Sequence, residues 1–210
     1  MQPNHIVCRG NNRRRLFSFP RDYLSYLRLL SAALERHECL LHGLCLMTNH
    51  VHLLLTPPTI EATSKAMQQV NQRYAQLHNH KRKGSGKLFE QSFESDPVES
   101  ERHLAFCVLY IDANPHSAAM RNRNRYPWST HAMHLGRPGA ARIPPSMIVH
   151  DAWYHGLGSC PTERAEAYER CFQEYRASGG DPEFRARAER MEPPETGESR
   201  LERPDRSSAA

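Results

Sequence analysis

The stretch "MTNHVHLLL", residues 47–55, places two histidines one residue apart inside an otherwise apolar run. The apolar run "ECLLHGLCLM" comes directly before it, and the turn-prone pair Thr48 and Asn49 separates the two runs. Two apolar runs joined by a short turn are typical of an antiparallel hairpin. The stretch therefore predicts the second strand of a β-hairpin.

Side chains alternate between the two faces of such a strand. Val51, Leu53 and Leu55 are expected to face a core. His50 and His52 are expected to project together from the opposite face. The strand can thus be buried on one side and still present two imidazoles side by side on the other.

Further elements are predicted on both sides of the hairpin. "NHIVCRG" at 4–10 is a short strand candidate, and 21–36 and 59–80 have the apolar spacing of helices with one buried face. "LFEQSFES" at 88–95 is a plausible further strand, followed by a helix over 99–114. That last helix should end at 114, because a proline follows and disfavours helical geometry in the residue before it.

The order of elements is β-α-β-β-α-β-α, which predicts an α+β fold with a ferredoxin-like antiparallel sheet and a C-terminal helical extension. We expect a main domain over residues 1–135 and an extension over 136–177, which includes an isolated amphipathic helix at 161–177. Residues 178–210 have low hydrophobicity with frequent Pro, Gly, Glu and Arg, and are expected to be a disordered tail.

Length and composition limit the class of protein. The 210 residues suffice for one ordinary domain with appendages. The sequence contains no apolar run of membrane-spanning length and no signal-peptide layout at its start, so a cytoplasmic protein without a membrane partner is expected. The six cysteines are scattered without a CxxC pair, which favours reduced thiols over disulfides or structural zinc.

Charge is distributed unevenly along the chain. Residues 1–135 carry 17 Lys and Arg against 10 Asp and Glu, whereas residues 136–210 carry 11 against 13. A basic main domain suggests binding of a polyanion, since Lys and Arg gain free energy by displacing phosphate counterions. A merely solvated basic surface is an equally good reading of the charge alone.

Two histidines on one sheet face can be neighbouring ligands of a divalent ion, although a pair of half-buried histidines bonded to a loop or water is the commoner arrangement. A third ligand should come from elsewhere, and the helix at 99–114 is the obvious source. It carries Tyr110 and Asn114, four residues apart and hence on one helical face. Tyr110 is a candidate nucleophile. An aromatic anchor of the helix is the commoner role for such a tyrosine, and Tyr74 on the preceding helix is a competing nucleophile.

The sequence resembles the single-tyrosine HUH transposases, and within them the REP-associated tyrosine transposases. The resemblance rests on "HIVCRGNNRRRLF", "CLMTNHVHLLL", "NQRYAQLHNHKRKGSGKLFEQSF", "YIDANP" and "YPWST", which span about residues 4–135 in the order of the family. It implies a metal-dependent endonuclease and strand transferase that cleaves single-stranded DNA at hairpin-flanked sites through a 5′-phosphotyrosine intermediate.

Carried over residue by residue, the resemblance implies that His50 and His52 bind Mg²⁺ or Mn²⁺, that Tyr110 is the nucleophile, and that Asn114 is a third metal ligand. It implies a REP-like hairpin as the DNA partner and leaves open whether the protein is a monomer or a homodimer. The basic runs would contact the DNA. The expected DNA-binding residues are Arg9, Asn11, Arg13, Arg14, Arg15, Arg73, Lys81, Arg82, Lys83 and Lys87.

Two other functions fit the same residues. The domain could be a non-catalytic nucleic-acid-binding module, in which the histidines only pack or stack. It could also be a metal-dependent nuclease that forms no covalent intermediate. The three readings differ in whether DNA becomes linked to the protein and in whether Tyr110 is needed for that link.

Overall fold

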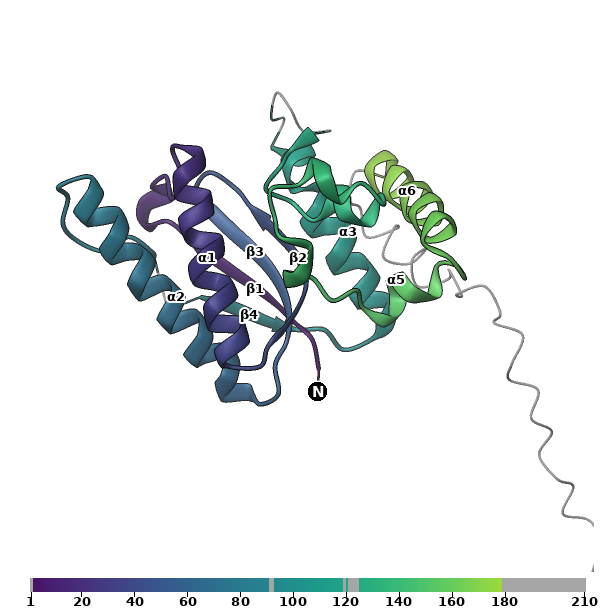
Figure 1. Ribbon diagram of the computed structural model, residues 1–210, viewed down its shortest axis with the longest axis horizontal. Helices are drawn as coiled ribbons and strands as arrows, with labels where there is room; N and C mark the ends of the chain where they lie inside the picture. The colour runs from purple at the N-terminus through teal and green to yellow at the C-terminus, as the bar shows by residue number, and fades with distance from the viewer. Residues whose placement is uncertain (1, 91–92, 119, 121–124, 179–210) are drawn as a thin grey trace, which may run out of the picture.

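A computed structural model of the chain describes residues 2–90, 93–118, 120 and 125–178 (Figure 1). The strands are β1 (Asn4–Arg9), β2 (Leu40–Leu46), β3 (His50–Thr56) and β4 (Glu94–Pro97). The α-helices are α1 (Pro20–Arg36), α2 (Ile60–Lys81), α3 (Glu101–Ser117), α4 (His131–His134), α5 (Ala152–Gly156) and α6 (Pro161–Ala177). Short 3₁₀ helices lie at Asn11–Arg13, Pro138–Ala140 and Pro145–Met147.

The four strands form one antiparallel sheet in the order β2-β3-β1-β4. In the central pair, Val7 lies opposite His52 and Arg9 lies opposite His50. This order and the alternation with helices confirm the predicted α+β, ferredoxin-like fold with a C-terminal helical extension.

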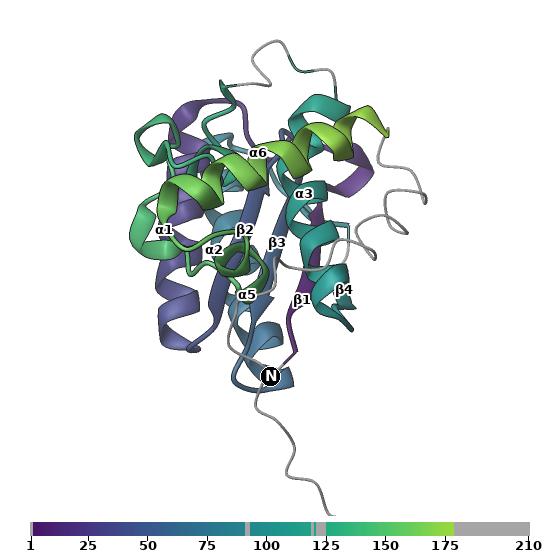
Figure 2. The same cartoon turned by 90° about the vertical axis from the view of Figure 1, so that its right-hand side faces the viewer.

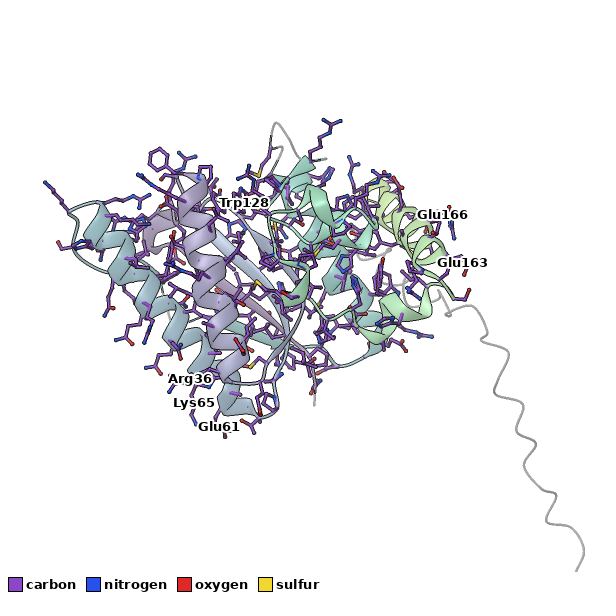
Figure 3. The ribbon with its side chains drawn as sticks, in the orientation of Figure 1. Arg36, Glu61, Lys65, Trp128, Glu163 and Glu166 are labelled. Atoms are coloured by element: carbon purple, nitrogen blue, oxygen red, sulfur yellow. The ribbon has the colours of Figure 1, made fainter. Side chains whose placement is uncertain are left out.

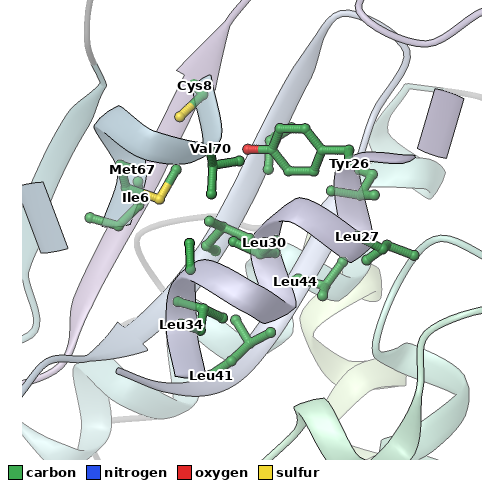
Figure 4. Packing of buried hydrophobic residues seen from close by; sticks show 14 of the residues in the cluster. Ile6, Cys8, Tyr26, Leu27, Leu30, Leu34, Leu41, Leu44, Met67 and Val70 are labelled. Atoms are coloured by element: carbon green, nitrogen blue, oxygen red, sulfur yellow. The ribbon is translucent and has the colours of Figure 1, made fainter. Parts of the chain in front are cut away.

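Helices α1 and α2 cover one face of the sheet and enclose the larger core (Figure 4). Val51, Leu53 and Leu55 of β3 all belong to this core, as the alternation predicts. Leu30 of α1 and Val70 of α2 pack there with no exposed surface. Side chains satisfy backbone amides at the start of both helices. Asp22 accepts hydrogen bonds from two backbone amides before α1, and Thr59 caps α2.

The opposite face is covered by α3, with α5 and α6 packed against α3 (Figures 1 and 2). The amphipathic helix predicted at 161–177 is therefore not isolated, because its buried face lies on α3. That face includes Tyr168 and Phe172, both almost fully buried. Glu163 and Glu166 are exposed and point away from α3 (Figure 3). The sheet thus has helices on both faces, and the histidines of β3 lie beneath α3.

The outer edge of β2 is paired with a segment that follows α3. The Leu46 amide donates to the Trp128 carbonyl, and the Thr130 amide donates to the Leu44 carbonyl. Thr130 Oγ1 also accepts a bond from the Leu44 amide. The "YPWST" sequence therefore closes this edge of the sheet, where unpaired backbone groups would otherwise be exposed.

Two predicted boundaries were wrong. The helix expected to end at Asn114 continues through Pro115 to Ser117. Asn114 and Pro115 are both buried, so tertiary packing outweighs the local preference, and the helix still ends within one turn of the proline. Among the described residues of the strand expected at 88–95, Phe89 forms a bridge with Gly10, and β4 begins at Glu94 and runs to Pro97.

The cysteines, the lengths of the helices and the C-terminal residues bear on three further expectations. All six cysteines are free thiols, as predicted. Among the described residues, no helix is long and apolar enough to cross a membrane. The predicted disordered tail, apart from its first residue, lies outside the described residues.

Candidate active site

His50 and His52 lie on the α3 side of the sheet, at the start of β3. Their ring centroids are 4.9 Å apart, so the predicted pair is a real neighbouring pair of imidazoles. His50 is partly exposed, whereas His52 is buried. The hydrogen bonds at one ring nitrogen of each histidine decide what its other nitrogen can do.

The turn residue before β3 orients His50. The His50 Nδ1 atom lies 2.9 Å from Asn49 Oδ1, and because an amide oxygen only accepts, Nδ1 carries the proton. The ring nitrogen left over is Nε2. Burial lowers the pKa of His50, and the nearby Asn114 side chain only partly offsets this effect. The ring is therefore held neutral, as a metal ligand must be.

His52 is oriented by a residue of the neighbouring strand. Its Nδ1 atom lies 3.0 Å from His5 Nε2, and the two rings stack with centroids 5.3 Å apart. Burial and then the neighbouring charges of His50 and His5 hold the pKa of His52 well below its ordinary value. His52 is thus neutral, with Nδ1 engaged and Nε2 left over.

Tyr110 of α3 lies against these histidines. Its ring makes edge contacts with His52 and His5, with centroid distances of 5.5 Å and 5.7 Å, and stacks on Phe106 one helical turn earlier. The side chain is 36% exposed although α3 itself is largely buried. A phenol held at the histidine pair and reachable from solvent can act on a bound substrate.

Asn114 completes the group. Its Nδ2 donates to the Tyr110 carbonyl at 2.9 Å, which leaves Oδ1 as the amide atom for the histidine side of the helix. Asn114 is buried. The four-residue spacing from Tyr110 therefore delivers a phenol and an amide oxygen to one place, as the sequence predicts.

These residues fit a divalent metal ion. Two neutral imidazoles with Nδ1 engaged, together with one amide oxygen, form a partial ligand set that leaves positions for oxygen atoms of a substrate. Among the described residues, no cluster of three or more His, Cys, Asp or Glu side chains is arranged to hold a metal. A metal site here therefore depends on the amide of Asn114 rather than on a third acidic or imidazole ligand.

A buried network holds the helix that carries Tyr110. Asp112 has 1% of its surface exposed and accepts hydrogen bonds from Thr130 and Tyr168, each at 2.8 Å. Ser129 donates to the same carboxylate, and His134 Nδ1 lies 2.6 Å from it. Burial alone would raise the pKa of Asp112, but the paired His134 and these hydrogen bonds outweigh burial and lower it. The carboxylate is therefore ionised, and it ties α3 to α4 and α6.

The two basic runs, about 70 residues apart in sequence, meet at the His50 end of the sheet. The Asn11 amide donates to the Leu88 carbonyl, and Gly10 bridges Phe89. The Gly10 amide donates to the Asn49 carbonyl, directly beside His50. The predicted DNA-binding residues at this edge are Arg9, Asn11, Arg13, Arg14, Arg15, Lys83 and Lys87, and all but Asn11 are exposed.

The remaining predicted DNA-binding residues are placed differently. Arg82 Nη2 lies 2.9 Å from Asp22 Oδ2, so it joins the end of α2 to the start of α1. Lys81 donates to Ser25 at 3.4 Å and is exposed. Arg73 lines a groove between α1 and α2, on the side of the sheet away from His50. These three cations therefore lie on the α1–α2 side and are not among the cations beside the histidines.

Tyr74, the competing nucleophile, lies on the wrong face. It is 2% exposed, belongs to the α1–α2 core and donates to the Leu16 carbonyl at 2.8 Å. Burial, and then the charge of Asp22, raises the pKa of the Tyr74 phenol above its ordinary value. The sheet separates this phenol from the histidine pair, so it has no access to a substrate bound there.

Comparison with known proteins places the chain in a family. A family model for IS200-like transposases matches residues 3–114, more than half of the chain. The chain therefore belongs to the IS200-like transposase family. No curated protein matches it at a significant level.

Two solved structures are similar to the chain. One is a REP-associated tyrosine transposase bound to a REP hairpin, with 14% identity and a TM-score of 0.55 over 71% of this chain and 86% of the other. The second, a Deinococcus radiodurans R1 protein assigned as a transposase, has 22% identity and a TM-score of 0.40 over 52% and 88% of the two chains. The first match shows that the two proteins share a fold.

Sequence reasoning missed His5, Asn49 as an orienting group, and the network around Asp112. His5 lies on β1 in a run that reads as an ordinary strand, and its contact with His52 depends on the register between β1 and β3. Register between distant strands has no local signature. The alternation of the two strands could have placed both histidines on one face only once that register was known.

Proposed function

We propose that the protein is a metal-dependent endonuclease and strand transferase, that is, a transposase that acts on single-stranded DNA beside a hairpin, with Tyr110 as the nucleophile. One observation carries the proposal: the ring of Tyr110 contacts His52 on the face of the sheet that also holds His50 and Asn114. A phenol, two neutral imidazoles and an amide oxygen in one place suit phosphoryl transfer better than any purely structural role.

The chemistry needs a single exchange of phosphodiester bonds. Tyr110 Oη attacks phosphorus, the bond from phosphorus to the 3′ oxygen breaks, and the phenol proton ends on that oxygen as a 3′-hydroxyl. The 5′-phosphate remains on Tyr110. Attack on this link by another 3′-hydroxyl reverses the exchange and joins strands, so no external energy source is required.

The ligand residues prepare the site for a phosphate. We propose that His50, His52 and Asn114 hold Mg²⁺ or Mn²⁺, which when bound supplies positive charge to the scissile phosphate. The neutral state of the two histidines keeps both lone pairs available for this role. The packing of Phe106 against Tyr110 restricts where the phenol oxygen can move.

We propose a DNA hairpin as the partner. The solved relative with a TM-score of 0.55 is bound to a REP hairpin. In this chain the exposed cations of the loops at 9–15 and 83–87 lie at the His50 end of the sheet, where they can hold the phosphates of DNA that enters the site. Arg73, Lys81 and Arg82, which face the α1–α2 side, would contact only DNA that extends beyond this edge.

We propose that residues 1–135 act as the catalytic domain and that residues 136–177 support it. The supporting role is favoured by the contacts of α5 and α6 with α3, the helix that carries Tyr110. The extension would then be part of the active enzyme rather than a detachable appendage.

The proposal predicts a covalent DNA adduct that depends on Tyr110. Labelled single-stranded DNAs with hairpins are incubated with the protein and Mn²⁺, and the mixture is denatured and separated on a gel. We expect labelled protein from the wild type and none from Tyr110→Phe, because only the attacking oxygen is removed. Tyr74→Phe is the matched control and should keep the adduct, since its phenol is buried on the other face.

The two other readings are outcomes of the same experiment. Cleavage without labelled protein would indicate a hydrolytic nuclease. Hairpin binding that Tyr110→Phe leaves unchanged, with no cleavage of any DNA offered, would indicate a binding module. An adduct that survives in Tyr110→Phe would overturn the assignment of the nucleophile.

A further inference from the structure

The contact between His5 and His52 serves no purpose in the chemistry described so far. His5 is the second residue of β1, lies diagonally from His52 across the β1–β3 pair, and is half-buried. The distance of 3.0 Å between His5 Nε2 and His52 Nδ1 is that of a hydrogen bond. The two rings also stack, and His52 is buried, so the contact lies within the packed part of the protein.

A hydrogen bond between two neutral imidazoles uses one proton and one lone pair. If His52 is to offer Nε2 to a metal ion, its own proton must lie on Nδ1, and Nδ1 must be the donor. His5 Nε2 is then the acceptor, and the His5 proton lies on Nδ1. The alternative, in which His5 donates, would place the His52 proton on Nε2 and block the metal position.

The second ligand histidine has a comparable partner. Asn49 Oδ1 accepts from His50 Nδ1 and so fixes the same tautomer there. Metal-bound histidines commonly have such a partner on the other ring nitrogen, and its loss typically weakens metal binding by about 10- to 100-fold. Each histidine of the pair would thus have its own orienting acceptor, one from the hairpin turn and one from β1.

We propose that His5 is a positioning residue, which accepts the Nδ1 proton of His52 and thereby directs the Nε2 lone pair of His52 toward the metal. The inference rests on the proposed metal-dependent function and deepens it. His5 also contacts the ring of Tyr110, but the role proposed for it in metal binding passes through its bond to His52.

The first measurement reads the tautomer in the metal-free protein. Histidine-labelled protein is examined by long-range ¹⁵N–¹H NMR, and the His52 ring is identified from its loss in His52→Gln. We expect a single Nδ1–H tautomer in the wild type and a mixture of tautomers in His5→Ala. His5→Gln should restore the single tautomer, because its amide oxygen can accept the same proton.

The second measurement is Mn²⁺ affinity by calorimetry on the same full-length proteins. We expect His5→Ala to bind Mn²⁺ about 10- to 100-fold more weakly than the wild type and His5→Gln to bind nearly as well as the wild type. His37→Ala is the matched control, since it removes another histidine whose ring bonds a side chain, Gln69, far from the site. It should leave the affinity unchanged.

Failure of the inference and failure of the proposed function give different results. An unchanged His52 tautomer and unchanged Mn²⁺ affinity in His5→Ala would overturn the role of His5. Equal losses in His5→Ala and His5→Gln, or a similar loss in His37→Ala, would also overturn it, because packing would then be responsible. A wild type that binds no Mn²⁺ would overturn the metal in the proposed function, while the tautomer measurement would still decide the role of His5.

Discussion

At the scale of single residues, the candidate site depends on which atom of each side chain is already engaged. Asn49 and His5 occupy Nδ1 of the two histidines, and Asn114 uses its Nδ2 on the Tyr110 carbonyl. What remains in each case is a lone pair on the side where a metal and a phosphate would bind. The residue types suit a metal ion, and these hydrogen bonds decide which atoms would be left to bind it.

Gly10 is a residue whose size matters to the proposed DNA interface. A Cβ atom at this position would collide with the Arg14 carbonyl oxygen and lie 3.2 Å from the Asn49 carbonyl oxygen. Both are backbone atoms, so the loop that carries the arginines would have to move. We expect Gly10→Ala to lower the free energy of unfolding by about 1–3 kcal/mol and to weaken hairpin binding, measured by urea denaturation and by fluorescence anisotropy.

Gly139→Ala provides the comparison for that experiment. An added Cβ there meets no atom within 4 Å, so stability and hairpin binding should both match the wild type. Wild-type binding by Gly10→Ala would show that the conformation of the basic loop is unimportant for DNA recognition.

At the scale of elements, α3 is held between the sheet and the C-terminal helices by Asp112. The carboxylate is buried two residues from Tyr110 and bonds side chains of α4, α6 and the segment that pairs with β2. A buried charge is tolerated only when it is fully paired and hydrogen-bonded. The network therefore fixes the position and rotation of α3, the helix that carries Tyr110, relative to the sheet.

Tyr168→Phe tests this coupling between α6 and α3. The substitution keeps the ring and removes the hydroxyl, which donates to the Asp112 carboxylate at 2.8 Å and also lies 2.8 Å from His131 Nδ1. We expect the free energy of unfolding to fall by about 1.5–3 kcal/mol, the range for a hydrogen bond to a charged group, as measured by urea denaturation.

Glu166→Gln is the control for the same helix, because this residue is exposed and points away from α3 (Figure 3). It should change stability by less than about 0.5 kcal/mol. Equal stability of Tyr168→Phe and the wild type would mean that α6 does not hold α3 through Asp112.

The same scale shows what the sequence can predict. The hairpin was predictable because Thr48–Asn49 is a local turn and the alternation of β3 is local too. The end of α3 was not predictable, because burial of Asn114 and Pro115 outweighs the local tendency of proline to end a helix. Tyr110 and Asn114 could be paired from helical spacing, whereas His5 meets His52 only through the register of two strands distant in sequence.

At the scale of the whole molecule, folding buries several histidines in neutral form. Burial, and then neighbouring His134 and His155, lowers the pKa of His150 to about 4. Burial likewise lowers the pKa values of His78 and His131. Unfolding exposes these rings to water, where a histidine has its ordinary pKa of about 6.5.

This burial predicts a stability that falls in mild acid. The unfolded chain takes up a proton at His150 near pH 6.5, whereas the folded chain does so only near pH 4. The stability that a neutral His150 contributes is thus fully present above pH 6.5 and is lost as the pH falls toward 4. In metal-free protein, urea denaturation from pH 7.5 to 4 should show this loss, and His150→Gln should reduce its steepness. Identical slopes for the two proteins would contradict the prediction.

The tryptic peptides of the chain allow a direct test of whether Tyr110 forms the bond to DNA. Trypsin cleaves after Arg102 and Arg121, which releases Tyr110 as the only tyrosine of its peptide, whereas Tyr74 lies in the separate peptide 74–81. After reaction with hairpin DNA and Mn²⁺, nuclease trimming and mass spectrometry should find a nucleotide on peptide 103–121. A nucleotide on peptide 74–81, or on any other peptide, would contradict the account.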